Sequence, residues 1–160
     1  MILRPTPRFV FSHPAHAVAF GFGAGLAPTA PGTFGTLLGW AIGLALGAAH
    51  PDAVLLAALA FFAVGVWACG VTGRHLGVAD HGGMVWDEVA AFLLVLALVP
   101  PELPWQLAAF VAFRFFDIAK PPPIRHFERR YHGGFGVMFD DVLAAGYSLL
   151  LLAALKRLFF

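Results

Sequence analysis

Acidic residues stand at the edges of apolar runs in this sequence, where a charge is costly. Asp87 and Glu88 open one run, Asp117 closes another, and Asp140 and Asp141 open the last. Like charges that converge raise one another's pKa unless a cation joins them. Carboxylate oxygens without cysteine suit a hard cation such as Mg²⁺, which takes its remaining ligands from water and phosphate. These residues therefore predict a site for a divalent cation.

Helix capping is a simpler explanation for a single acid at a helix start. There the helix dipole stabilises a negative charge, and the side chain can accept hydrogen bonds from free backbone N–H groups. Capping needs only one acceptor, so it leaves the second acid of each pair unexplained. It also fails for Asp117, which stands at the C-terminal end of its run, where the dipole is unfavourable. Metal binding accounts for all of these positions.

Basic residues near the acids provide the complement to a phosphate. Lys120 and Arg125 follow Asp117 within the polar segment 118–141, and Arg114 precedes it by about one helical turn. Arginine presents a planar fork of donors to phosphate oxygens, and lysine contributes a point charge. An ion pair with Asp117 is the alternative role for Arg114. Acids and bases together favour metal-assisted chemistry on a phosphate.

Several other catalytic designs do not match the sequence. Cys69 is the only cysteine, and His75 stands where a Cys-x5-Arg nucleophile loop requires arginine. Neither an Asp-x-Asp motif nor a Ser-Gly-His motif occurs. The glycine-rich stretches 27–36 and 132–141 could turn backbone N–H groups toward an anion, but neither has the spacing of a P-loop. We expect 132–141 to be flexible backbone ahead of a helix.

Composition predicts that a membrane surrounds the helices that carry these residues. Hydrophobic residues make up 60% of the chain and charged residues only 12%, whereas soluble domains carry about a quarter charged residues. The net charge of +1 gives no indication of nucleic-acid binding. We expect an all-α integral membrane protein, a compact bundle of about four to five transmembrane or partial helices. The apolar runs are 34–49, 53–72, 86–99, 105–117 and 142–156.

Two further segments complete the predicted organisation. The Gly- and Pro-broken segment 15–33 could be re-entrant, and residues 1–14 are expected to form a short cytoplasmic arm of a single domain over 1–160. Glycines recur every four residues within the run 34–49, which predicts close approach of a neighbouring helix. These glycines are Gly35, Gly39, Gly43 and Gly47.

The distribution of positive charge predicts the orientation. With these helices, the N-terminus and the polar segments 73–88 and 118–141 share one side, and only Lys156 and Arg157 lie opposite. Positive charge favours the cytoplasmic side. Of the nine acids, all but Asp52 and Glu102 belong to this side. The site is therefore expected to face the cytoplasm. The basic residues on this side are Arg4, Arg8, Arg74, Lys120, Arg125, Arg129 and Arg130.

Three motifs, in this order, resemble the phosphatidylglycerophosphatase A family. They are "GFGAGLAPTAPGTFGT", "DHGGMVWDEVAAFLL" and "FRFFDIAKPPPIRHFERRYHGGFGVMFDDVLAAG", and the resemblance covers about residues 17–155. It implies a small membrane enzyme of the bacterial inner membrane that uses Mg²⁺. Its implied reaction is hydrolysis of phosphatidylglycerophosphate to phosphatidylglycerol and inorganic phosphate, the final step of phosphatidylglycerol synthesis.

The residues and the resemblance together assign roles to the candidates. We expect the metal at Glu88, Asp117, Asp140 and Asp141, directly or through water, with Asp87 as the next candidate. We expect the phosphate at Thr33, Lys120, Arg125 and His132. The catalytic acids and bases are expected to be Asp80, His81, Asp87 and Asp117, with Asp80 or His81 taking the proton of an attacking water.

Two other classes of protein remain open at this stage. A small cation transporter or channel also places charged residues in a membrane, but it predicts acids at midplane depth rather than at one interface. A lipid-binding scaffold needs the basic residues but has no use for paired acids. The oligomeric state does not follow from the sequence.

Overall fold

The computed structural model describes residues 5–159, apart from the side chains at 48, 49 and 51. These residues form helices and no strand, which confirms the predicted all-α class. In chain order the elements are α1 (Pro7–Val10), α2 (Pro14–Ala19), the 3₁₀ segment η1 (Gly21–Leu26), α3 (Pro31–Ala49), α4 (Pro51–Leu76), α5 (Trp86–Leu98), α6 (Leu103–Ala119), α7 (Ile124–Arg130) and α8 (Gly133–Phe159).

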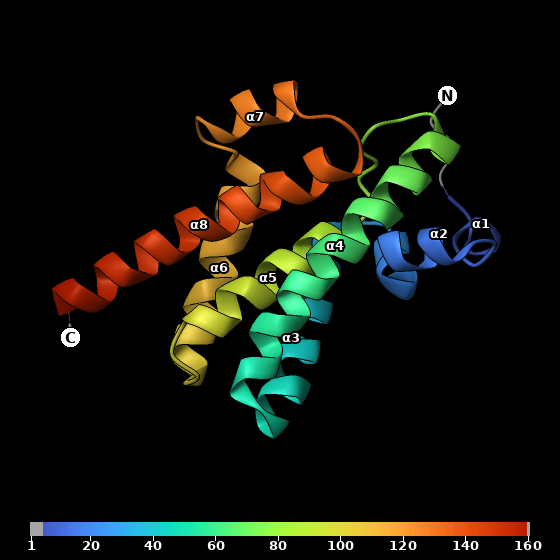
Figure 1. Ribbon diagram of the computed structural model, residues 1–160. Helices are drawn as coiled ribbons and strands as arrows, with labels where there is room; N and C mark the ends of the chain where they lie inside the picture. The colour runs from blue at the N-terminus through green and yellow to red at the C-terminus, as the bar shows by residue number, and fades with distance from the viewer. Residues whose placement is uncertain (1–4, 160) are drawn as a thin grey trace.

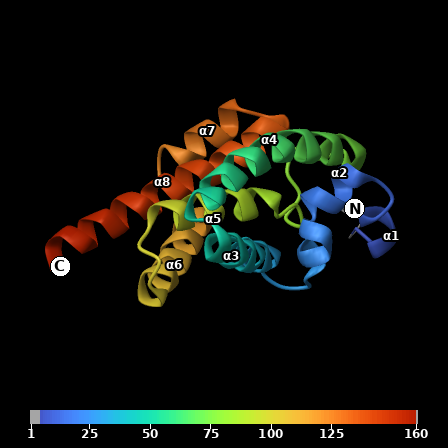
Figure 2. The ribbon, with the colours of Figure 1, turned by 60° about the horizontal axis from the view of Figure 1, so that its bottom comes forward.

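Helix α5 lies at the centre of the bundle. Helices α3, α4 and α8 pack against it, and α6 packs against α8 (Figures 1 and 2). Most side chains of α5 are buried, and its first turn carries Asp87 and Glu88. The central position of α5 therefore places these two acids inside the protein.

Proline and glycine set several helix ends. Pro31 and Pro51 stand in the first turn of α3 and α4, where a missing backbone N–H breaks no helical hydrogen bond. Gly77 ends α4 in the left-handed conformation, with φ of 70°. These local signals make α3 and α4 an antiparallel pair joined at His50.

The start of α8 differs from the prediction. The helix begins at Gly133 rather than at 142, so the expectation of flexible backbone over 132–141 is wrong. The glycines there serve close packing instead. A Cβ atom on Gly134 would lie 1.9 Å from the carbonyl oxygen of Val66 on α4. Glycine thus lets the first turns of α8 touch the backbone of α4.

Three of the four glycines in the α3 repeat pack closely as predicted, whereas a Cβ atom on Gly47 would make only an ordinary contact of 3.6 Å with Val54. A Cβ atom on Gly35 would lie 2.7 Å from Cβ of Val85, and one on Gly39 would lie 2.9 Å from the carbonyl oxygen of Val89. Gly43 is equally close to Leu96. The repeat therefore brings α3 against α5 and against Val85, the residue that precedes α5.

Two helices are long and apolar enough to cross a membrane, judged by length and composition among the described residues. They are Asp52–Leu76, with mean hydropathy of 2.4, and Gly133–Phe159, with mean hydropathy of 1.7. The larger number of spanning helices stays a prediction, as does re-entry of the segment 15–33. That segment folds as α2, η1 and the start of α3. The expected arm 1–14 includes α1, whose Val10 is buried, while residues 1–4 lie outside the described part.

Candidate active site

Three buried carboxyl groups form the core of the site. Asp87 and Glu88 come from the first turn of α5, and Asp141 comes from α8. One oxygen from each lies within 4.8 Å of the other two. Asp87 is 7% exposed, Glu88 9% and Asp141 3%. The packing of α8 against α5 therefore joins two acid pairs that are far apart in the sequence.

One oxygen of each of these carboxyl groups lacks a partner that would offset its burial. Oδ1 of Asp87, Oε2 of Glu88 and Oδ2 of Asp141 are buried without a hydrogen-bond partner among the described residues. An unpaired buried charge is strongly unfavourable, and buried charges are normally paired or bound to a metal. The all-oxygen donor set suits a hard cation. The residues present therefore fit Mg²⁺.

Arg114 on α6 joins this cluster to Asp117. Its Nη1 donates a hydrogen bond to Oδ2 of Asp117 and lies 3.7 Å from Oε1 of Glu88. The side chains of Arg114 and Asp117 are only 14% and 12% exposed. Asp117 also lies against Asp141. Arg114 therefore holds acids from two helices together. The ion pair with Asp117 is the alternative role expected from the sequence, whereas the contact with Glu88 was not predicted.

The N-terminus of α3 approaches the same cluster. A Cβ atom on Gly32 would lie 2.3 Å from Oε1 of Glu88 and 2.9 Å from a guanidinium nitrogen of Arg114. No described side chain caps this helix end, and the predicted phosphate ligand Thr33 follows Gly32 directly. The positive end of the helix dipole thus lies beside the acids, where an anion would be stabilised.

Lys120 organises a second group of acids. It ends α6 with φ of 42°, and its Nζ lies 3.0 Å from Oε1 of Glu128 and 3.5 Å from Oδ2 of Asp140. Burial by itself lowers the pKa of Lys120, but the hydrogen bond to Glu128 and the charge of Asp140 outweigh it and raise that pKa. Asp140, an expected metal ligand, therefore pairs with Lys120. Asp87 takes its place in the carboxyl cluster with Glu88 and Asp141.

A pocket of about 220 Å³ opens beside Glu128 and Asp140, the two acids that pair with Lys120. Asp80, Glu128, His132 and Asp140 contribute polar groups to its lining. Asp80 is exposed at the edge of this pocket, and desolvation by the surrounding protein raises its pKa, although the charge of Lys120 opposes the shift. The pocket thus gathers three of the predicted site residues, Asp80, His132 and Asp140.

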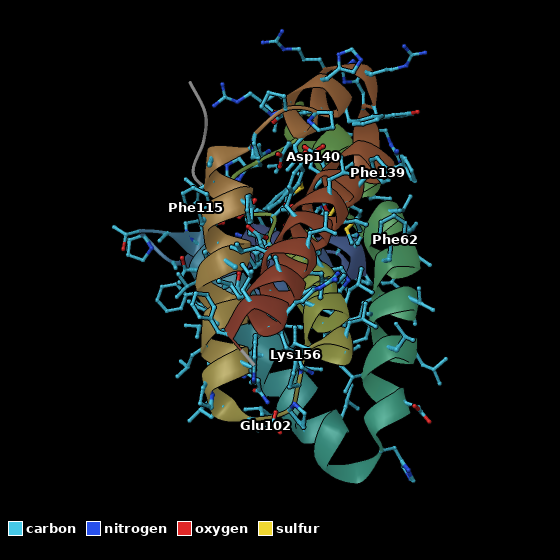
Figure 3. The ribbon with its side chains drawn as sticks, turned by 90° about the vertical axis from the view of Figure 1, so that its left-hand side faces the viewer. Phe62, Glu102, Phe115, Phe139, Asp140 and Lys156 are labelled. Atoms are coloured by element: carbon cyan, nitrogen blue, oxygen red, sulfur yellow. The ribbon has the colours of Figure 1, made fainter. Side chains whose placement is uncertain are left out.

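Figure 3 shows where these groups lie along the molecule. Asp140 is near the end that carries α7, whereas Glu102 and Lys156 lie toward the opposite end. Asp141 follows Asp140 directly and forms the cluster with Asp87 and Glu88, so this cluster lies toward the same end of the bundle.

Comparison with known proteins assigns this chain to a family. A family model described as phosphatidylglycerophosphatase A matches residues 17–156. The chain belongs to the phosphatidylglycerophosphatase A family. It is therefore an enzyme, a phosphatase, and the transporter alternative is not favoured.

Bacterial relatives of this phosphatase support the assignment. The phosphatidylglycerophosphatase A of Haemophilus influenzae is 44% identical over 155 residues, which cover 95% of this chain and 94% of the relative. That of Escherichia coli is 39% identical over 142 residues, covering 88% and 83%. A protein of Bacteroides thetaiotaomicron, named provisionally as a phosphatidylinositol-3-phosphatase, is 41% identical over 147 residues, covering 87% and 91%. No solved structure matches the chain.

Two further expected residues of the phosphatase form hydrogen bonds with the backbone. Nη2 of Arg125 donates a hydrogen bond of 3.2 Å to the carbonyl oxygen of Ala119, at the end of α6. Nδ1 of His81 accepts a hydrogen bond of 3.0 Å from the backbone N–H of Gly83. These contacts orient loops, so the phosphate role of Arg125 and the proton-transfer role of His81 stay predictions.

Proposed function

We propose that this phosphatase hydrolyses phosphatidylglycerophosphate to phosphatidylglycerol and inorganic phosphate in a Mg²⁺-dependent reaction, the final step of phosphatidylglycerol synthesis. The observation that carries the proposal is the cluster of Asp87, Glu88 and Asp141, each of which has one buried oxygen without a hydrogen-bond partner among the described residues. The names of the relatives from Haemophilus influenzae and Escherichia coli support this substrate.

Asp87, Glu88 and Asp141 would hold the metal, with Asp117 as the next ligand. When bound, Mg²⁺ would neutralise phosphate charge and supply an oriented water. The protein's own residues would complete the site around the phosphate. Arg114 offers a guanidinium with a buried, unpartnered Nε within the described residues, and the α3 N-terminus offers backbone N–H groups beside Thr33.

Lys120 and Asp80 would act from the neighbouring pocket. Lys120 carries a positive charge that its acidic neighbours stabilise. Asp80 has a raised pKa, which makes its carboxylate a stronger base than an ordinary aspartate. We therefore assign proton acceptance to Asp80 ahead of His81, whose Nδ1 is engaged with the backbone.

We propose further that the protein spans the inner membrane several times, with the site on the cytoplasmic face. Large apolar side chains are exposed along α4, α6 and α8, among them Leu56, Val111 and Leu150. Monomeric soluble proteins rarely expose large contiguous apolar surfaces. Lipid would cover these side chains, and the basic residues of α7 would lie at the anionic cytoplasmic surface.

The reaction can be tested on protein purified in detergent. Phosphate release from phosphatidylglycerophosphate is measured with Mg²⁺ and with EDTA. We expect release only with Mg²⁺. A folded sample that releases no phosphate with Mg²⁺ would refute the proposed function, and equal release with EDTA would refute the metal requirement.

A further inference from the structure

An apolar groove lies beside the acid cluster on the outside of the bundle. Its volume is about 260 Å³, and all of its lining residues are apolar. Helix α4 contributes Leu59 and Phe62, α5 contributes Ala90 and Leu94, and α8 contributes Phe139 and Val142. We call this hollow the α4–α8 groove. Figure 3 shows Phe62 and Phe139 on the same side of the molecule.

The groove continues a helix face that begins at the acid cluster. Asp87, Ala90 and Leu94 stand at positions i, i+3 and i+7 of α5, so they share one face of that helix. Leu94 lies roughly 10 Å along the axis from Asp87. On α8, Asp140 and Asp141 stand between the groove residues Phe139 and Val142. The hollow therefore starts about one helical turn from the acids.

We propose that the α4–α8 groove binds an acyl chain of the phospholipid substrate while its phosphate lies at the acid cluster. This proposal rests on the proposed function. An extended peptide or a sugar brings polar groups that need hydrogen-bond partners, and the lining offers none. A hydrocarbon chain needs none. Because Ala90 and Leu94 of the groove share one face of α5 with Asp87, an acyl chain in the groove and a phosphate at the acid cluster can belong to one molecule.

Groove binding makes substrate affinity depend on the acyl chain. A long-chain substrate uses both the groove and the acid cluster, whereas a water-soluble substrate with six-carbon chains relies chiefly on the acid cluster. A bulky side chain in the groove should therefore weaken binding of the long-chain substrate selectively.

The test uses Leu59→Trp, with Leu56→Trp as its control. Both leucines belong to α4 and are well exposed, at 60% and 67%, but only Leu59 lines the groove. KM and kcat are measured for dioleoyl-phosphatidylglycerophosphate in detergent micelles and for the dihexanoyl compound. We expect Leu59→Trp to raise KM for the dioleoyl substrate roughly tenfold. Its kinetics with the dihexanoyl compound, and both sets of kinetics of Leu56→Trp, should match the wild type.

A second pair of variants tests the opposite wall. Val142→Trp on α8 should repeat the selective effect, whereas Leu150→Trp, outside the groove on the same helix, should not. Activity on the dihexanoyl compound reports folding for every variant.

Three results would overturn the proposal. Unchanged dioleoyl kinetics in both groove variants would mean that the groove holds bulk lipid only. An equal effect of the groove and control variants would mean that the substitutions act on the protein generally. A change of oligomeric mass in detergent, seen by light scattering for Leu59→Trp alone, would assign the groove to a second copy of the chain. Wild-type protein inactive on both substrates would instead refute the proposed function, and the groove assignment with it.

Discussion

Arg114 connects two carboxyl groups that belong to different helices. It donates to Asp117 on its own helix and lies 3.7 Å from Glu88 on α5. Without this cation, both acids would face Asp141 uncompensated. At the scale of single residues, the site is therefore an arrangement of buried acids that needs cations to be stable.

Removing Arg114 should harm both folding and catalysis. We expect Arg114→Ala to lower the free energy of unfolding by about 3 kcal/mol, because it leaves buried carboxylates unpaired. We expect kcat to fall roughly 100-fold, because a donor to the phosphate is lost. Thermal unfolding and phosphate release measure the two effects. Arg129→Ala, on exposed α7, is the control. If the two variants have the same unfolding temperature and the same kcat, Arg114 does not belong to the site.

Asp141 offers a test of the metal that does not depend on activity. In Asp141→Asn, one repelling charge is gone, so unfolding without Mg²⁺ should occur at a higher temperature than in the wild type. Mg²⁺ at about 100 times its Kd should stabilise the wild type by about 2.7 kcal/mol and the variant by much less.

The exposed acid Asp52 supplies the control for this measurement. Asp52→Asn should keep the full Mg²⁺-dependent shift in unfolding temperature. If Asp141→Asn keeps the same shift, Asp141 is not a metal ligand.

At the scale of elements, the contact between α3 and α5 positions the helix end beside the acids. Gly39 is central to this contact, because a Cβ atom there would lie 2.9 Å from the backbone oxygen of Val89. Backbone atoms cannot move aside as a flexible side chain can. The approach of Gly32 to Glu88 depends on the same packing.

Substitution of Gly39 should separate these helices. We expect Gly39→Val to lower the free energy of unfolding by about 1–3 kcal/mol through overpacking. Gly47→Ala is the matched control on α3, since its nearest contact would be an ordinary 3.6 Å, and it should stabilise the helix by about 0.5–1 kcal/mol. Thermal unfolding of both variants measures the difference, and a neutral Gly39→Val would contradict the role of this contact.

At the scale of the whole molecule, the site occupies one end of the bundle and Lys156 lies toward the other (Figure 3). The proposed topology puts these ends on opposite sides of the membrane. A membrane-impermeant thiol reagent should label Lys156→Cys in cells whose outer membrane has been permeabilised. It should label Arg129→Cys only after the inner membrane is opened as well. The buried Cys69 should stay unlabelled in the folded protein. Labelling of Arg129→Cys from outside would contradict the proposed orientation.

Much of the chemistry of this protein can be predicted from its sequence because it depends on residue types and local patterns. Apolar runs with proline and glycine at their ends indicate the helices, and α3, α4, α5 and α6 lie close to the expected ranges. Paired acids at the edges of these runs indicate a site for a hard cation, because this inference depends on carboxylate oxygens and not on their exact positions in space. The glycine repeat of α3 likewise indicates a close contact, although it does not name the partner.

Tertiary structure decided which of these residues meet. Asp140 and Asp141 are adjacent, but successive side chains of a helix point about 100° apart, so packing turns Asp141 toward α5 and Asp140 toward Lys120. The same packing brought Asp87 into the cluster. Glycines that look flexible in the sequence became the start of α8, because the backbone of α4 lies against them. Residue type is local information, whereas the direction of a side chain depends on how distant helices pack.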